Sequence, residues 1–214
     1  MVIHSIESGP VSTIGYVIAD EDSRQALIVD VPMESRTLFG AWLTAKQFTP
    51  IGILLTHGHF DHVGDVASLA RDLDVPVHIH ILDAPMLEDP TNNFRDLNLN
   101  IEGMKTFTPL EPGDVLECGR LRLHIIHAPG HTKGHCVFYE MREGILLSGD
   151  VLFHRSIGRT DLHGGDYDVL MQTITKKLLT LPEDTIVYPG HGEQTTIGYE
   201  RAHNPYVLEY LDHY

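Results

Sequence analysis

The stretch that decides the fold is Ile51-Gly52-Ile53-Leu54-Leu55-Thr56-His57-Gly58-His59-Phe60-Asp61-His62, in which an apolar run leads into three histidines and one aspartate. The apolar run predicts a buried β-strand that ends near Leu55. Imidazole nitrogen and carboxylate oxygen are ligands that zinc, iron and manganese accept. Packing alone does not explain four such groups, because it would leave their polar atoms unpaired at the end of an apolar segment. The stretch therefore predicts a metal site at the end of a core strand in a mixed α/β fold.

Three more candidate ligands follow other predicted strands, each in a glycine-containing turn. They are His131 after the strand 121–126, Asp150 after the strand 145–147 and His191 after the strand 185–188. Glycine in such a turn lets the backbone approach closely. A strand, a turn and then a ligand, repeated four times along the chain, is the pattern that a metal site at one edge of a sheet requires.

Length and charge limit the classes of protein to which this chain can belong. The 214 residues are enough for one large domain with a substantial core, and we expect a single domain over residues 1–214. Thirty acidic residues against fifteen Lys and Arg give a net charge of −15, which argues against a nucleic-acid-binding surface. Bound divalent cations would neutralise part of that charge, and the fifteen histidines agree with a metal site.

Cysteine usage and apolar runs predict the compartment. Cys118 and Cys136 are the only cysteines, so no disulfide framework is expected, and Cys136 is interpreted as a small buried apolar residue. The first residues lack the charged and apolar regions of a signal peptide. No apolar run approaches the roughly 18 residues of a membrane span. We expect a soluble, cytoplasmic protein without a membrane partner.

Periodicity and turn residues predict an alternation of strands and helices. The expected strands are Ile14–Ala19, Ala26–Asp30, Ile51–Leu55, Pro76–Ile81, Val115–Glu117, Leu121–Ile126, Cys136–Glu140, Ile145–Leu147 and Thr185–Tyr188. The expected helices are 35–48, 62–73, a short helix capped by Asp83, a helix from the Asp166 cap to about Leu179, and one tail helix broken before Asn204-Pro205. Residues 89–105 are expected to form a loop or a helical flap near the site. Two sheets with helices outside are the economical arrangement of these elements.

The motifs together resemble the metallo-beta-lactamase superfamily, and the resemblance covers essentially the whole chain. Within that superfamily, Pro129-Gly130-His131-Thr132-Lys133-Gly134-His135 resembles the PGHTxGH element of the glyoxalase II-like branch. Gly158-Arg159-Thr160-Asp161 and the ending Gly198-Tyr199-Glu200-Arg201-Ala202-His203-Asn204-Pro205 resemble short bacterial glyoxalase II-like hydrolases. The resemblance implies an αββα sandwich, with two mixed β-sheets flanked by helices.

The resemblance also implies two divalent metal ions, with zinc expected first and iron or manganese suited to the same ligands. The implied ligands are His57, His59 and His131 for the first metal, Asp61, His62 and His191 for the second, and Asp150 as the bridge. His135 is expected to orient the site through a hydrogen bond rather than to bind metal.

A mechanism is implied by this ligand set. Two metals about 3.5–4 Å apart can bind and deprotonate one bridging water. The resulting hydroxide would attack a carbonyl carbon, and the metals would stabilise the oxyanion. A thioester such as S-lactoylglutathione suits the site because a thiol, with a pKa near 8.5, leaves with little help from a general acid. Asp61 and Asp150 are the expected catalytic carboxylates, and Asp61 would orient the nucleophile as well as bind metal.

The chain departs from glyoxalase II proper, in which a C-terminal helical region helps to bind glutathione. Only 23 residues follow His191, so we do not expect that region in this chain. The candidate cations for an anionic substrate are Lys133, Arg155, Arg159 and Arg201. Two further departures are Asp30-Val31-Pro32-Met33, where relatives usually continue the aspartate with Pro-Gly, and His154-Arg155-Ser156-Ile157, where a glycine-rich stretch is common.

Two alternative functions remain beside the thioester hydrolase. A persulfide dioxygenase of the same superfamily would hold one iron on His57, His131 and Asp150, a set of two histidines and one carboxylate. A non-catalytic metal-binding scaffold is the alternative from another class, and it would require a decayed ligand set. Lactonase and beta-lactamase activities fit the quoted motifs less well. The natural acyl group and thiol, the metal and the oligomeric state stay open.

The remaining histidines have no place in the implied ligand set. His78 and His80 alternate along one strand and are interpreted as structural, as are His4, His124, His203 and His213. His127 and His154 lie beside the predicted ligand loops, so they are candidates for contacts to ligands or to substrate.

Overall fold

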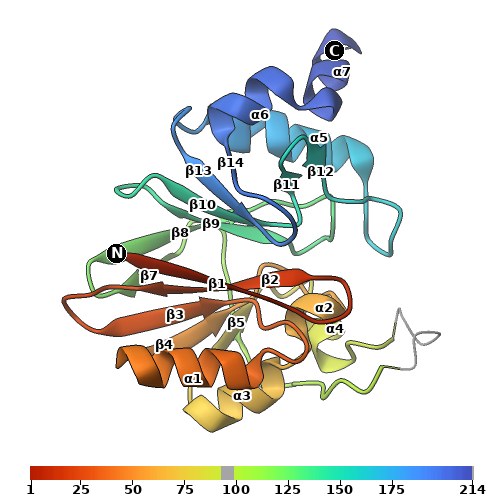
Figure 1. The fold of residues 1–214 in the computed structure, drawn as a ribbon. Coiled ribbons are helices and arrows are strands. Elements are labelled where there is room, and N and C mark those ends of the chain that lie inside the picture. Colours follow the sequence, from red (N-terminus) through yellow and green to blue (C-terminus); the bar gives the residue numbers. More distant parts are fainter. Residues whose placement is uncertain (93–98, 214) are drawn as a thin grey trace.

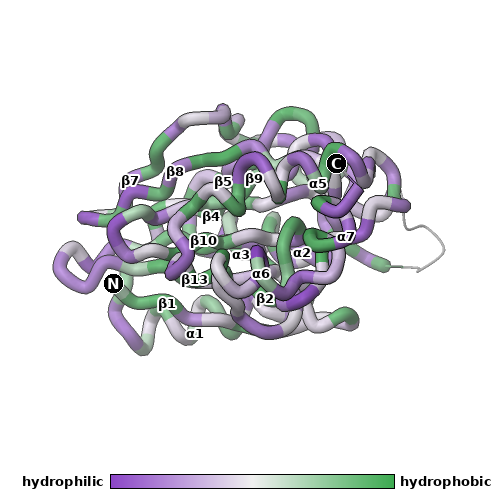
Figure 2. Tube along the Cα trace, turned by 90° about the horizontal axis from the view of Figure 1, so that it is seen from above, coloured by the Kyte–Doolittle hydropathy of each residue, from purple (hydrophilic) through white to green (hydrophobic). Residues whose placement is uncertain are grey.

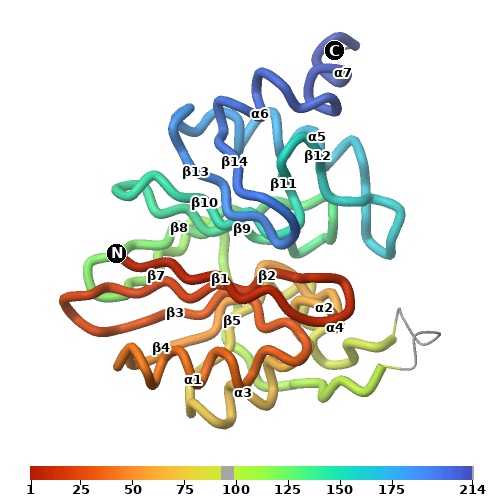
Figure 3. Tube along the Cα trace, in the orientation of Figure 1, coloured from red at the N-terminus to blue at the C-terminus, as the bar shows by residue number. Residues whose placement is uncertain are grey.

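Two β-sheets stack face to face, and helices cover the outer face of each sheet (Figure 1). The structure is a computed structural model that describes residues 1–92 and 99–213. The first half of the chain forms one sheet with its helices, and the second half forms the other (Figure 3). This arrangement is the predicted αββα sandwich.

Both sheets are mixed. In spatial order the first contains β1 (Val2–Ser8), β2 (Thr13–Ala19), β3 (Gln25–Val29), β4 (Thr49–Leu54), β5 (Val77–Ile79) and β6 (Thr108–Pro109). The second contains β14 (Thr195–Thr196), β13 (Ile186–Pro189), β10 (Ile145–Gly149), β9 (Cys136–Glu140), β8 (Leu121–His127) and β7 (Val115–Cys118). A short ribbon pairs β11 (Leu152–Phe153) with β12 (Ser156–Ile157). Strands β3 to β6 run parallel, as do β10 and β13, and the other pairs are antiparallel.

The helices lie outside the sheets. Those of the first half are α1 (Arg36–Lys46), α2 (Phe60–Val63), α3 (Val66–Leu73) and α4 (Ala84–Glu88). Those of the second half are α5 (Tyr167–Lys176), the 3₁₀ turn η2 (Leu178–Thr180), α6 (Ile197–His203) and α7 (Pro205–His213). No helix among the described residues is both long enough and apolar enough to cross a membrane.

Three apolar layers hold the sandwich together. Alternate residues of one strand point to opposite faces, so Val17 packs with the helices outside the first sheet and Ile18 packs between the sheets. Val137 and Phe138 divide in the same way between the third layer and the middle one. Strands buried on both faces, such as β2 and β10, are apolar along most of their length. In Figure 2, hydrophobic stretches lie near the labels of β4, β5 and β8.

The structure differs from the predicted elements at several positions. Strand β1 was not predicted, because it lies at the sheet edge with most of its residues half-buried and a polar pattern. The helix predicted over 62–73 is divided between α2 and α3. Contacts with the segment 31–33 interrupt the helix. Asp65 N–H donates to the Val31 carbonyl instead of to a carbonyl of the helix. Gly64 packs so closely on Met33 that an added Cβ would lie 2.7 Å from the Met33 nitrogen.

The tail holds two helices where one was predicted. α6 ends at His203, as expected for a helix before Asn204-Pro205. Pro205 then begins α7, where a missing N–H costs nothing, and the Asn204 Oδ1 atom accepts from Tyr206 N–H at 3.1 Å.

The loop predicted over 89–105 falls partly on residues 93–98, which lie outside the described residues. On either side of that gap, residues 89–92 and 99–105 form neither helix nor strand.

Candidate metal centre

The sandwich brings all seven predicted ligands together at one edge of the sheets. His57 and His59 follow β4, while Asp61 and His62 lie in α2. The other three are His131 after β8, Asp150 after β10 and His191 after β13. Two sets of ligand atoms lie within 4.8 Å of one another: we call His57, His59 and His131 the first group, and Asp61, His62 and His191 the second group. A third set, His57 with His62 and Asp150, overlaps both groups and meets the same distance.

The first group consists of three buried imidazoles. Nε2 of His57 lies 3.0 Å from Nδ1 of His59, and Nε2 of His131 lies 2.9 Å from the same Nδ1 atom. Burial, together with the neighbouring histidines, lowers the pKa of His57 well below its ordinary value and that of His59 to about 3. The imidazoles of His57 and His59 are therefore neutral, which is the form that binds a metal.

The second group combines one carboxylate with two imidazoles. Oδ2 of Asp61 lies 3.4 Å from Nε2 of His62 and 3.2 Å from Nε2 of His191. Burial alone would raise the pKa of Asp61, but His62, the His191 hydrogen bond and Thr13 outweigh it and lower the pKa to about 2. Thr13 Oγ1 donates to the Asp61 carboxylate at 2.7 Å and so fixes its orientation.

Asp150 lies between the two groups. Its Oδ1 atom is 3.3 Å from Nε2 of His62, and its Oδ2 atom is 3.6 Å from Nε2 of both His131 and His191. Although burial opposes ionisation, the surrounding histidines hold the pKa of Asp150 well below its usual range. One ionised carboxylate thus reaches both groups.

The donor set fits a pair of divalent cations. His62 Nε2 and Asp150 Oδ1 are buried and have no hydrogen-bond partner among the described residues. Burial lowers the pKa of His62, but Asp61, Asp150 and Asp30 raise it well above the ordinary value, because they favour a positive charge at this point. A divalent cation would supply that charge and occupy the two unpaired atoms.

Asp30 positions two of the candidate ligands. Its Oδ2 atom lies 2.8 Å from Nδ1 of His62 and accepts from Thr56 Oγ1 at 2.7 Å, while Thr56 Oγ1 lies 3.0 Å from Nδ1 of His57. A carboxylate on the far ring nitrogen fixes the orientation of a ligating histidine. The sequence showed Asp30 at the end of a predicted strand, but nothing there indicated which side chain it would contact.

Asp83 also has a role that the sequence did not reveal. It stands before α4 as predicted, but its side chain does not cap that helix. The buried carboxylate instead accepts from Gly58 N–H at 3.2 Å, Thr132 Oγ1 at 2.6 Å and Gly134 N–H at 2.7 Å. It therefore joins the loop of His57 and His59 to the loop of His131.

His135 lies where a residue that orients the site is expected. Its Nε2 atom accepts from Asp150 N–H at 3.0 Å, and its ring stacks on that of His57 with centroids 4.8 Å apart. Among the other histidines, His80 stacks on His127 at 4.5 Å, and His127 Nε2 lies 2.8 Å from the Lys133 carbonyl. His154 lies 3.5 Å from the exposed Glu193 carboxylate, apart from the ligand groups.

The four candidate cations have different surroundings. Arg159 forms a two-pronged ion pair with Asp161 at 2.8 Å, and Arg201 pairs with Glu183 at 2.7 Å and donates to main-chain carbonyls. Arg155 is exposed, and its backbone N–H donates to Glu200. Lys133 is exposed and forms no ion pair with any described residue.

A cavity of about 180 Å³ opens onto the ligands. Its lining consists of His59, Asp61, His131, Asp150 and His191, together with Val11, Phe60, Arg159 and Leu162. A small substrate group can therefore reach both ligand groups at once, against a partly apolar wall.

Comparisons with known proteins agree with this geometry. The sequence profile of the metallo-beta-lactamase superfamily matches residues 9–191. A protein of Haemophilus influenzae named hydroxyacylglutathione hydrolase GloC is 35% identical over 87% of this chain and 89% of its own.

Two solved structures are similar over almost the whole chain. The BLEG-1 B3 metallo-beta-lactamase is 41% identical, with a TM-score of 0.89 over 96% of this chain and 99% of its own. TTHA1623, crystallised in a di-iron-bound form, is 38% identical, with a TM-score of 0.86 over 95% of this chain and 99% of its own.

Proposed function

The chain belongs to the metallo-beta-lactamase superfamily, and we propose that it is a dinuclear metal-dependent hydrolase that cleaves thioesters of the S-lactoylglutathione type. The observation that carries the proposal is the position of Asp150: its Oδ1 atom lies 3.3 Å from His62, and its Oδ2 atom lies 3.6 Å from both His131 and His191, so one carboxylate reaches both groups of ligands. A single metal would leave either the first or the second group of ligands unused.

The proposed ligands are those of the two groups. His57, His59 and His131 would hold one metal, and Asp61, His62 and His191 would hold the other, with Asp150 between them. When bound, two divalent cations supply Lewis acidity and lower the pKa of water.

The chain's own residues orient the reactants. The ionised Asp61 carboxylate, held by Thr13, can accept a hydrogen bond from the attacking water and aim it into the cavity. Asp150 is held through its N–H by His135, so its carboxylate keeps one direction. Phe60 and Leu162 offer an apolar wall to the acyl group in the same cavity.

A thioester is the preferred substrate because of its leaving group. The imidazoles and carboxylates that line the cavity, His59, His131, His191, Asp61 and Asp150, are all proposed metal ligands, so none of them would be free to protonate a poor leaving group such as an amine. A thiolate needs little protonation to leave, since the thiol pKa lies near 8.5. The name of the Haemophilus influenzae relative supports the same choice.

The test is hydrolysis of S-lactoylglutathione by the metal-loaded protein and by its Asp150→Ala variant. We expect cleavage by the wild type and a loss of at least about a hundredfold in kcat/KM in the variant, because a group shared by both metals is removed. The control is Asp22→Ala. Asp22 is an exposed acidic residue outside the candidate site, and its carboxylate pairs with Arg120. Activity that survives in Asp150→Ala would contradict the proposal.

The likeness to the BLEG-1 B3 metallo-beta-lactamase favours beta-lactam hydrolysis as a second candidate. The attack on a carbonyl is shared, but the leaving group is an amine, which demands a proton that a thiolate does not. A chromogenic cephalosporin assayed beside the thioester decides between them, and we expect the thioester to have the larger kcat/KM.

A further inference from the structure

Lys133 lies in a loop that three hydrogen bonds hold in place. Asp83 accepts from Thr132 Oγ1 at 2.6 Å and from Gly134 N–H at 2.7 Å. The Lys133 carbonyl lies 2.8 Å from Nε2 of His127, whose ring is stacked on His80. The base of the Lys133 side chain is therefore fixed, while its ammonium group has no ion-pair partner among the described residues.

Two cavities meet at Lys133. One, of about 320 Å³, lies between Lys133, His163 and α4, and the other, of about 370 Å³, lies between Lys133 and the start of α5. Both are also lined by Leu82 and Gly164, and a Cβ at Gly164 would lie 3.5 Å from Lys133 Cγ. Pro85, Met86, Pro129 and Val169 add apolar surface. We call this combined space the Lys133 cavity.

The Lys133 cavity adjoins the metal centre along two stretches of chain. His131 lines the cavity of the ligands, and Lys133 follows two residues later, within about 7 Å of extended chain. Leu162 lines the cavity of the ligands, and the next residue, His163, lines the Lys133 cavity. The two cavities share no lining residue, but neighbouring residues of the same two loops line both of them.

Three carboxylates line the Lys133 cavity, and each accepts a hydrogen bond. Asp83 accepts three, Asp89 accepts from Thr91 Oγ1 at 3.2 Å, and Asp166 caps α5 by accepting from Val169 N–H at 3.0 Å. Lys133 is the lysine of this lining, and none of the three carboxylates forms a described ion pair with it. Since the protein carries a net charge of −15, an anionic substrate needs such a local cation.

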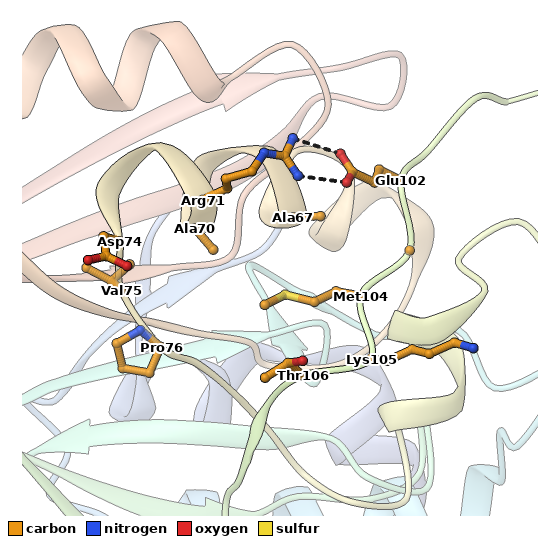
Figure 4. A pocket seen from close by; sticks show the side chains of 11 residues that line it. Ala67, Ala70, Arg71, Asp74, Val75, Pro76, Glu102, Met104, Lys105 and Thr106 are labelled. Atoms are coloured by element: carbon orange, nitrogen blue, oxygen red, sulfur yellow. Dashed lines mark hydrogen bonds and ion pairs between the residues drawn. The ribbon is translucent and has the colours of Figure 1, made fainter.

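Two other cavities of comparable size do not offer this combination. One, of about 400 Å³, has no lysine or arginine among the described residues that line it. The second lies on the first half of the chain. It has about 500 Å³ and lies between α3 and the segment 102–106, where Arg71 is taken up by a two-pronged ion pair with Glu102 (Figure 4). None of the seven candidate metal ligands lines it. Lys105 stands at its edge and provides a matched lysine outside the metal centre.

We propose that the Lys133 cavity binds the anionic arm of the substrate's thiol, whose charge is a carboxylate or a phosphate, while the acyl carbon lies at the metal ligands. The proposal rests on the thioester hydrolysis proposed above. It assigns to Lys133 the selection among thiols, and it leaves Arg159 and Arg201 with their ion pairs.

The test compares Lys133→Ala with Lys105→Ala in the metal-loaded protein. Three lactoyl thioesters are assayed: those of glutathione, of coenzyme A and of uncharged N-acetylcysteamine. Selectivity is kcat/KM for a charged thioester divided by kcat/KM for the uncharged one. We expect Lys133→Ala to lower the selectivity for one charged thioester about tenfold, through a higher KM, which is the loss typical of one charge-assisted contact. We expect Lys105→Ala to leave both selectivities unchanged.

The charged thioester that depends on Lys133 identifies the source of the anion, carboxylate for glutathione and phosphate for coenzyme A. If cleavage occurs and Lys133→Ala changes neither selectivity, the inference is overturned while the proposed function stands. If the wild type cleaves no thioester, the proposed function fails, and binding of S-hexylglutathione and of coenzyme A decides the inference. Weaker binding to Lys133→Ala than to wild type supports it, and equal or undetectable binding overturns it.

Discussion

At the residue scale, two buried carboxylates outside the candidate ligand set hold the site together. Asp30 and Asp83 are both buried, and each joins segments distant in the sequence: Asp30 joins Thr56 to His62, and Asp83 joins Gly58 to the loop 132–134. A buried carboxylate is costly unless its oxygens are fully hydrogen-bonded, so each one fixes the groups that donate to it.

Asp83 provides the first prediction. In Asp83→Asn one acceptor oxygen becomes an NH₂ group that faces a donor, so the loops of His59 and His131 lose part of their alignment. We expect the affinity for the more weakly bound metal to fall about 10- to 100-fold. Competition with a chromogenic chelator measures this. Asp65→Asn is the control, because Asp65 also accepts a backbone N–H, from Arg36, but lies outside the site. Equal affinity in wild type and Asp83→Asn would show that the loops are held without this carboxylate.

How far the site could be predicted also depends on the residue. His57 to His62 stand together in the sequence, and His131, Asp150 and His191 each follow a strand in a glycine turn, so the chain itself marked them. Asp30 and Asp83 carry no such mark, because their partners are backbone and hydroxyl groups set by the tertiary fold. The surroundings of Lys133, Arg159 and Arg201 were equally hidden, since an ion pair depends on which acid the fold brings near.

At the element scale, the strands with several apolar residues and a clear turn beside them were predicted best. Strand β4 ends where the apolar run ends, and β8, β9 and β10 lie within a residue or two of their predicted bounds. The edge strand β1 was missed because it has no continuous apolar run. The break between α2 and α3 was missed because it depends on the contact of Gly64 with Met33, which local periodicity does not contain.

Helix α5 gives a prediction at this scale. Asp166 was predicted to cap the helix, and its side chain accepts from Val169 N–H at 3.0 Å. Asp166→Ala leaves that N–H without its cap, so we expect the free energy of unfolding to fall by about 1 kcal/mol. Chemical denaturation measures the change. Asp168→Ala, an acid in the first turn without the capping position, is the control and should cost less. An equal loss in both variants would mean that charge at the helix start matters and the cap does not.

At the scale of the whole molecule, the metal centre links the two halves of the sandwich. His57 to His62 belong to the first half, while His131, Asp150 and His191 belong to the second (Figure 3). Metal ions bound at this cluster would stabilise the folded state, because they would bind it and not the unfolded chain. Without the ions, the ionised Asp61 and Asp150 lie buried and close together.

Chelation should therefore lower the melting temperature. Metal at about a thousand times its Kd contributes about 4 kcal/mol, which corresponds to a shift of roughly 8–16 °C for a chain of this size. Calorimetry with and without a chelator measures the shift, and the difference should be smaller in Asp150→Ala. The same melting temperature with and without chelator would show that the two halves do not depend on metal.

If each of the two ligand groups binds a metal ion, the purified protein should contain both ions and should hydrolyse S-lactoylglutathione. Metal analysis combined with the hydrolysis assay is therefore the decisive measurement. The account predicts about two metal ions per chain and cleavage of the thioester. One iron per chain without cleavage would contradict it: His62 and His191 would lose their proposed roles, and the persulfide dioxygenase with iron on His57, His131 and Asp150 would take the place of the hydrolase.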